Sequence, residues 1–429
     1  TSGKGLHLLL SPCPCRQRER SSLFLPLTLT DPCPRMRHRL RSLLLLLALG
    51  FTTAGKLPRR HITNKMRRSN VVMDEIDAAD SEQQQQLLRI PIPPIDPNGV
   101  KGVLSRMPQW VGDRFGEVIL SPSSSLAEGE AHVFQGNDGR ISVHAETTVD
   151  ALYAIHAYIR QFCFSMVAWD GAAFSNGACK KLEQTLTFHS PKVRFFGNPC
   201  TFSYSMVWWN WAKWEQFIDW LALSGFNMVL APVGQEFLWK QHWQDLGVSA
   251  EGVDAFLSGP AFYAWHRMGN IQRFGGAASD DFLAAQAKLN KRIVSRMTSL
   301  GIVPVLPTFA GFVPKEFVDQ HPDIKFTKNR CWLTFNDTNS CVYSISPTEP
   351  LFGQIAEHFI AKQRAFYGDA THVYSADAYN EIPPATFDER ALRQMAKAIY
   401  GGCRQGDEQC VWVLQSWAFS YDGWSDAAI

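Results

Sequence analysis

The pair Asn380 and Glu381 is the place in this sequence where residue type and spacing best support acid–base chemistry. The pair follows an apolar run, and Pro383 and Pro384 come shortly after it. A carboxyl on a proline-stiffened loop loses part of its hydration, which favours the protonated form that a general acid needs. Because the pair alone is a weak signal, a surface glutamate in an ordinary loop is the alternative interpretation.

Tryptophans strengthen the interpretation of Glu381 as an acid. The chain has 14 Trp, and five of them lie within residues 208–220. Two of these five share a helical face with apolar residues and are expected in the core: Trp211 and Trp214, with Ile218 and Leu221. Three others have no periodic partner and lie in or beside expected strand-end loops: Trp265, Trp332 and Trp417. Indole faces stack on the C–H faces of sugar rings, so these three indicate a sugar pocket, with structural packing as the alternative.

Other chemistries have less support. Cys331 and Cys341 are ten residues apart and Cys403 and Cys410 are seven apart, but no second C-x₂-C or paired histidines accompany them. Disulfides are therefore favoured over zinc, and no metal is expected. A thiol nucleophile at Cys200 lacks an identifiable general base. No GxGxxG or GxxxxGK[ST] motif follows an expected strand, so no cofactor is predicted.

The residues that could do chemistry follow the strands of a repeated strand–helix pattern. Expected strands cover residues 193–203, 227–233, 302–309, 372–378 and 410–415. Expected helices cover residues 211–224, 284–299 and 350–367, and a glycine follows each of them. Repeated strand–helix units predict an α/β fold with parallel strands, either an open doubly wound sheet or a (β/α) barrel. Since no nucleotide motif is present, the barrel is favoured.

A (β/α)8 TIM-type barrel carries its reactive groups at the carboxyl ends of eight strands, and only about the first five strands are visible in this sequence. Either the sequence is truncated within the catalytic barrel, or the fold is not a closed barrel. The first interpretation is favoured because the chain ends without a tail-like pattern.

The rest of the chain divides into four expected segments. Residues 1–35 form an extension that is expected to be disordered, residues 36–55 a signal peptide, and residues 56–98 a linker or pro-region. Residues 99–190 are expected to form a small N-terminal α+β domain, with strands at 118–120 and 141–144 and a helix over 149–164. The partial catalytic barrel covers residues 191–429.

The signal peptide is predicted from basic residues after Met36, an apolar run over 43–49 and small residues up to Gly55. The run is too short for a spanning helix, so no stable membrane anchor is expected, although an anchor is the alternative. Export would expose the cysteines to an oxidising compartment and would make the sequon at Asn336 a glycan acceptor. The product is expected to be lysosomal or secreted.

Charge argues against nucleic acid as a partner. The formal net charge is +2, but residues 1–70 hold 14 basic and 2 acidic groups, which leaves 28 basic against 38 acidic groups in the remainder. A folded part with net negative charge is a poor binder of polyanions. A homo-oligomer stays open, because nothing in the sequence decides it.

Five motifs together resemble the alpha-N-acetylglucosaminidases of glycoside hydrolase family 89. They are NPCTFSYSMVWWNWAKWEQFIDWLALSGFN (198–227), SGPAFYAWHRMGN (258–270), PVLPTFAG (304–311), YSADAYNEIPP (374–384) and VWVLQSW (411–417). The resemblance covers residues 151–429 in order and without large gaps. It implies a small N-terminal domain, a (β/α)8 barrel and a C-terminal helical domain.

The resemblance also implies a function and a set of site residues. The family consists of exo-acting, retaining hydrolases that remove terminal alpha-linked N-acetylglucosamine from heparan sulfate. Its general acid/base falls on Glu381, and its second glutamate, the nucleophile, would lie beyond Ile429. Its sugar-pocket residues fall on Asn198, Cys200, Tyr204, Trp265, Met268, Trp332, Asn380 and Trp417.

The cysteines depart locally from the family pattern. The family's close cysteine pair is broken because Asp337 occupies its first position, so we expect Cys341 to pair with Cys331. Cys163 is expected to pair with Cys179, since Ser165 stands where relatives have a cysteine. A bridge from Cys403 to Cys410 and a free thiol at Cys200 complete the expectation.

Two carboxyl groups are expected to perform the reaction. In an alpha-linked glucosaminide the 2-acetamido group is cis to the leaving oxygen and cannot attack C1 from behind, so the enzyme must supply the nucleophile. Retention places the two carboxyls about 5 to 5.5 Å apart, whereas inversion needs about 6.5 to 9.5 Å. A catalytically inactive sugar-binding fragment and a glycosidase for another sugar are the two rival functions.

Overall fold

The computed structural model describes residues 97–120, 126, 129–420 and 423–425. The expected extension and signal peptide, and nearly all of the expected linker, lie outside these residues and stay predictions. Within the described part of the chain, no helix combines the length and the apolar character that crossing a membrane requires.

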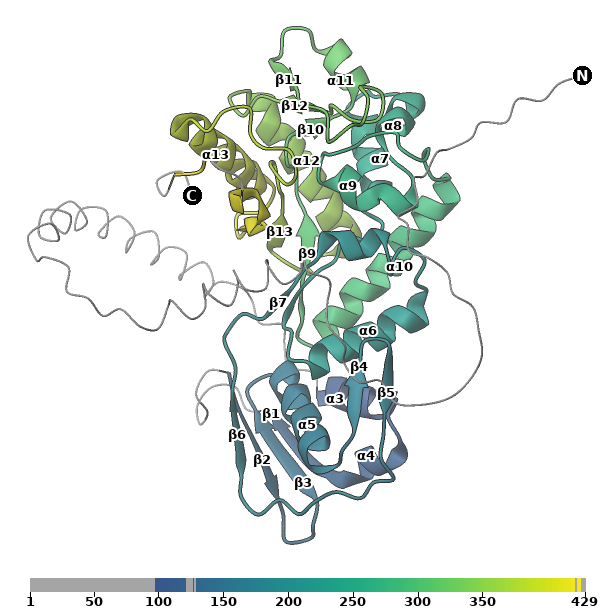
Figure 1. The fold of residues 1–429 in the computed structure, drawn as a ribbon, viewed down its shortest axis with the longest axis vertical. Helices are drawn as coiled ribbons and strands as arrows, with labels where there is room; N and C mark the ends of the chain where they lie inside the picture. The colour runs from purple at the N-terminus through teal and green to yellow at the C-terminus, as the bar shows by residue number, and fades with distance from the viewer. Residues whose placement is uncertain (1–96, 121–125, 127–128, 421–422, 426–429) are drawn as a thin grey trace, which may run out of the picture. The chain divides into compact units, whose positions relative to one another are not determined.

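The N-terminal elements form a four-stranded sheet that one long helix covers (Figure 1). The strand order is β1 (Phe115–Leu120), β3 (Ile141–Ala145), β2 (Glu130–Gln135) and β6 (Leu186–His189). Helices α3 (Pro97–Leu104) and α4 (Gln109–Arg114) precede the sheet, and α5 (Thr148–Phe162) packs on β2 and β3. Alternate residues of β3 are buried, as a strand with one covered face requires. The two expected strands and the expected helix are confirmed, while β2 and β6 were not singled out from sequence.

A hairpin and a parallel sheet follow. The hairpin consists of β4 (Met166–Ala168) and β5 (Gly171–Ala173). The parallel sheet has the order β14 (Val411–Val413), β13 (Val373–Ser375), β9 (Val303–Pro307), β8 (Met228–Leu230) and β7 (Phe195–Phe196). Every neighbouring pair in this sheet is parallel. Strands that neighbour one another in chain order, with helices between them, are the arrangement of a (β/α) barrel, so the predicted fold class is confirmed.

Seven helices accompany this sheet. They are α6 (Trp211–Leu223), α7 (Gln235–Asp245), α8 (Ala250–Phe256), α9 (Tyr263–Arg267), α10 (Asp280–Ser299), α12 (Pro350–Tyr367) and α13 (Glu389–Gly406). A small antiparallel sheet of β10 (Phe312–Val313), β12 (Tyr343–Ile345) and β11 (Phe326–Lys328), with α11 (Lys315–Gln320), is inserted between β9 and α12. Short 3₁₀ turns are η1 (Pro199–Ser203), η2 (Pro260–Phe262) and η3 (Ser416–Ser420). The insertion and the helices α7, α8, α9 and α13 were not anticipated.

The first strand of the parallel sheet is much shorter than the sequence suggests. Residues 193–203 are expected as one strand, but β7 ends at Phe196 and η1 begins at Pro199. Pro199 has no N–H for a sheet hydrogen bond, and the Asn198 side chain accepts a hydrogen bond from the Cys200 N–H at 3.0 Å, which starts the turn. This turn brings the residues after β7 into the candidate site.

Most of the expected helical core face is buried. Trp214, Ile218 and Leu221 are buried, but Trp211 is only half-buried, and the guanidinium of Arg292 lies 4.1 Å from its ring centroid. The cysteine pairing is confirmed at all positions, with bridges Cys163–Cys179, Cys331–Cys341 and Cys403–Cys410 and a free Cys200.

Candidate active site

Glu381 lies in the loop between β13 and α13, where the carboxyl end of a strand of the parallel sheet passes into a helix. Its side chain is half-buried, and the Nδ2 atom of the buried Asn270 donates a hydrogen bond to Glu381 Oε2 at 3.1 Å. The preceding Asn380 is buried. A carboxyl held by a buried amide at this edge of the sheet differs from an ordinary surface glutamate, and the position suits a reactive group.

The turn after β7 lies near Glu381, although β7 is the edge strand on the opposite side of the parallel sheet from β13 and β14. Cys200 on η1 is half-buried, and its pKa is raised first by burial and then by the charge of the nearby Glu381 carboxylate. Cys200 therefore stays a neutral thiol at neutral and acidic pH, which makes it a poor nucleophile. Asn198, also a predicted site residue, holds the backbone of this turn.

Aromatic residues come from several loops. The rings of Tyr204 and Trp265 meet edge to face with centroids 5.2 Å apart, and Tyr204 is 65% exposed. Trp332 stacks on Phe335 at 5.3 Å. Trp417 lies on η3, directly after β14, and is 56% exposed. Trp265 and Trp332 were expected in or beside strand-end loops, but Trp265 lies on α9 and Trp332 between β11 and β12 of the inserted sheet. Exposed and half-buried rings are suited to stacking on a sugar.

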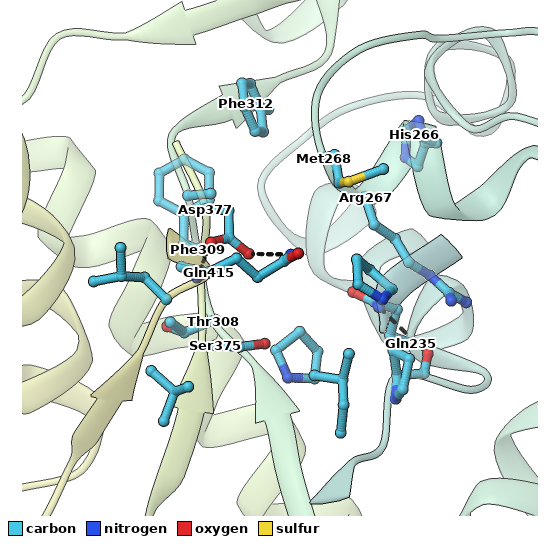
Figure 2. A pocket seen from close by; sticks show the side chains of 18 of the residues that line it. Gln235, His266, Arg267, Met268, Thr308, Phe309, Phe312, Ser375, Asp377 and Gln415 are labelled. Carbon is cyan, nitrogen blue, oxygen red and sulfur yellow. Dashed lines mark hydrogen bonds between the residues drawn. The ribbon is translucent and has the colours of Figure 1, made fainter. Parts of the chain in front are cut away.

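A cavity of about 110 Å³ lies among the strand ends of the parallel sheet (Figure 2). Residues from or just after all five strands line it, including Phe195, Leu230, Thr308, Ser375 and Gln415. Of the predicted site residues, Met268 lines this cavity; it is buried and follows α9.

Glu236 and Arg267 form an ion pair in the cavity wall that the sequence analysis did not select. Arg267 donates to the two Glu236 carboxylate oxygens at 2.7 and 2.9 Å, and Glu236 is 1% exposed. The neighbouring Tyr263 has a pKa raised by burial and by Glu236. The position of Glu236 soon after a strand was the available sequence signal, but nothing local identified its partner.

Asp377 and Gln415 form a second polar pair in this wall, and Figure 2 shows their side chains meeting. Both the backbone N–H of Gln415 and its Nε2 donate to Asp377, at 2.7 and 2.9 Å. Burial raises the pKa of Asp377, and the two hydrogen bonds from Gln415 oppose this effect. The pair joins the loop that contains Glu381 to the segment between β14 and η3, just before Trp417.

One cluster within the described ranges has the composition of a metal site, namely Cys331, Asp337 and Cys341. The two sulfurs are joined in a disulfide, so they offer no thiolates to a metal.

A protein-family model matches the barrel of this chain, and a known relative matches about two thirds of the chain. Residues 194–429 match the family model described as the alpha-N-acetylglucosaminidase (NAGLU) tim-barrel domain. Human alpha-N-acetylglucosaminidase is 36% identical over 298 residues, which are 68% of this chain and 40% of the human protein. The chain thus spans about two fifths of the length of this relative.

Two solved structures share the fold. The family 89 glycoside hydrolase from Clostridium perfringens in complex with 2-acetamido-1,2-dideoxynojirmycin has a TM-score of 0.68 and 24% identity, covering 82% of this chain and 39% of that chain. The same values hold for a Clostridium perfringens variant in complex with its substrate GlcNAc-alpha-1,4-galactose.

Proposed function

Because the chain belongs to the alpha-N-acetylglucosaminidase family, we propose that it forms part of a glycoside hydrolase that removes terminal alpha-linked N-acetylglucosamine. The observation that carries this proposal is the Glu381 carboxyl, which the buried Asn270 holds at the carboxyl end of a parallel sheet. The proposed substrate is a heparan sulfate type glycan, in keeping with the resemblance.

In the proposed mechanism Glu381 acts first as an acid and then as a base. It protonates the glycosidic oxygen while the C1–O bond breaks and a second carboxylate forms a bond to C1. Glu381 then takes a proton from the water that attacks C1 and releases the sugar from that carboxylate. The second carboxyl is proposed to come from a later strand of the barrel.

The proposed sugar pocket consists of residues from the turn after β7, from α9 and from the later loops. Tyr204, Trp265, Trp332 and Trp417 provide ring faces and edges, and Asn198, Cys200, Met268 and Asn380 provide smaller contacts. No cofactor takes part in this scheme. The protein is further proposed to enter the secretory route and to act in the lysosome or outside the cell.

Replacing Glu381 tests this proposal in the longest protein that carries the chain. Glu381→Gln keeps the shape of the side chain but cannot give a proton, so turnover of GlcNAc-alpha-1,4-galactose should fall by about 10² to 10⁴. An aryl glycoside with a good leaving group needs less protonation and should keep more of its first-step rate, which single-turnover kinetics measures.

The control is Glu408→Gln, because Glu408 is exposed after α13 and should leave both rates unchanged. Equal rates for Glu381→Gln and the unchanged protein would refute the acid role. Ligand binding without turnover would favour a sugar-binding protein, and a panel of aryl glycosides would reveal a preference for another sugar.

A further inference from the structure

Asn270, three residues beyond the end of α9, is a buried amide whose side chain points to the proposed acid. It is 0% exposed, and its Nδ2 donates to Glu381 Oε2 at 3.1 Å across 111 residues of sequence. Within the described part of the chain, Asn270 Oδ1 accepts no hydrogen bond. Among the described residues, the hydrogen bond to Glu381 is therefore the only one that this side chain makes.

The backbone of Asn270 contacts two segments that supply tryptophans, helix α9 and the loop between β11 and β12. Its N–H donates to the Trp265 carbonyl at 2.9 Å. Its carbonyl accepts a hydrogen bond from Ser340 Oγ at 2.6 Å, and that Oγ accepts one from the Trp332 N–H at 2.8 Å. Asn270 thus connects the loop of the acid with the end of α9, on which Trp265 lies, and with the loop that contains Trp332.

A role in stability alone does not account for this side chain. Burying an amide with an unbonded acceptor costs free energy, so an apolar side chain of similar shape would suit a position that serves only packing. The backbone hydrogen bonds to Trp265 and Ser340 need no particular side chain. The amide is thus accounted for by its contact with Glu381.

We propose that Asn270 is a positioning residue for Glu381, a role that rests on the proposed function of Glu381 as acid and base. The Nδ2–H group occupies Oε2, so the transferable proton is confined to Oε1, the oxygen left to face the glycosidic bond. The Asn270 Nδ2–H group can donate to Oε2 when Glu381 is an ionised carboxylate, and it can also donate to Oε2 when that atom is the C=O oxygen of the neutral acid. The contact therefore persists while Glu381 acts first as acid and then as base.

The experiment compares Asn270→Leu with the unchanged protein on two substrates, in the longest protein that carries the chain. Leu keeps the branching of Asn but has no donor. We expect kcat/KM for GlcNAc-alpha-1,4-galactose to fall about 10- to 100-fold, a part of the usual contribution of general acid catalysis. An aryl glycoside with a good leaving group should change by less than about 3-fold in its first step, and Tm should not fall.

Asn290→Leu is the matched control. Asn290 is also buried with an unbonded Oδ1 among the described residues, but its Nδ2 donates to the Ala231 carbonyl and to Tyr367 Oη. This variant is expected to lower Tm, and any change in kcat/KM should be the same for substrates with good and with poor leaving groups.

A second variant, Asn270→Asp, keeps the shape and adds a negative charge beside Glu381. A like charge favours the protonated pair, so the basic limb of the pH profile of kcat/KM should move to higher pH. This profile decides the question if Asn270→Leu does not fold.

Two results would overturn the role of Asn270 alone. In the first, Glu381→Gln slows the two substrates unequally, but Asn270→Leu changes the rates of both substrates equally. In the second, Asn270→Asp leaves the basic limb of the pH profile of kcat/KM unmoved. No effect of Glu381→Gln would overturn the proposed function, and the role of Asn270 with it.

Discussion

The Cys200 thiol lies on η1 within the electrostatic influence of Glu381. Burial and the Glu381 carboxylate both raise its pKa above the ordinary value of 9.0. A raised thiol pKa means that the thiolate forms only at more alkaline pH, so Cys200 carries a neutral S–H group at the pH of any cellular compartment. A neutral thiol is a poor nucleophile, which argues against Cys200 as the nucleophile of a hydrolase.

Alkylation measures this coupling directly. The rate of iodoacetamide reaction at Cys200 should rise with pH to a midpoint above 9.0, because only the thiolate reacts. Glu381→Gln removes the negative charge and should move the midpoint to lower pH. Mass spectrometry of the peptide that carries Cys200 follows the reaction, and Cys200→Ser gives the blank. A midpoint that ignores the Glu381 substitution would show that the two groups do not interact.

At the scale of elements, Asp219 on α6 links three parts of the chain. Its carboxylate accepts hydrogen bonds from Arg106 Nη2 at 2.8 Å and from Arg296 Nη2 on α10 at 2.9 Å. Asp219 is buried, and the side chain of Arg296 is largely buried as well. The pair of arginines holds the segment after α3 and helix α10 against α6, which follows the first strand of the parallel sheet.

Removing this carboxylate should destabilise the protein. Asp219→Ala leaves a largely buried guanidinium without its partner, which costs about 3 kcal/mol or more. Chemical denaturation measures the change in the free energy of unfolding, provided that the substitution leaves the m-value unchanged. Asp369→Ala is the control, because Asp369 pairs with Arg364 at the surface, where solvent screening leaves an ion pair with little effect on stability. Equal effects of the two substitutions would contradict the assignment.

Helix ends are the elements that the sequence placed best. Gly225, Gly301 and Gly368 were expected to end helices, and each has positive φ, of 84°, 77° and 71° respectively. At the start of α6 the Asn210 side chain accepts a hydrogen bond from the Lys213 N–H at 3.1 Å. These signals are local, since a cap needs only residues within one turn of the helix.

At the scale of the whole molecule, the predicted export route accounts for the three disulfides. Bridges of this kind persist in oxidising compartments and are rare in the cytosol. Translation is predicted to begin at Met36, with cleavage near Ala54. N-terminal sequencing of the exported protein should find a start between about Gly50 and Lys56. Recovery of residues 36–49 in the mature product would contradict a cleaved signal peptide and favour an anchor.

The sequence by itself determined the order of the five strands of the parallel sheet, the ends of three helices, the residue types at the strand ends, and Glu381 as the candidate acid. Each of these is written in a short window: an apolar run, a periodic face, a glycine, or a carboxyl after a strand. Together with the family resemblance, the spacing of the cysteines also led to the correct pairs, because the partners lie 16, 10 and 7 residues apart.

Only the tertiary structure decided which distant side chains meet. Asn270 reaches Glu381 across 111 residues, Gln415 reaches Asp377 across 38, and Arg106 reaches Asp219 across 113. No local pattern specifies such pairs, because they arise only after elements separated in sequence pack together. Gln415 and Asp377 meet because β14 and β13, the strands before them, are neighbours in the parallel sheet. The polar contacts that position the candidate acid are therefore a property of the packed sheet and not of any one motif.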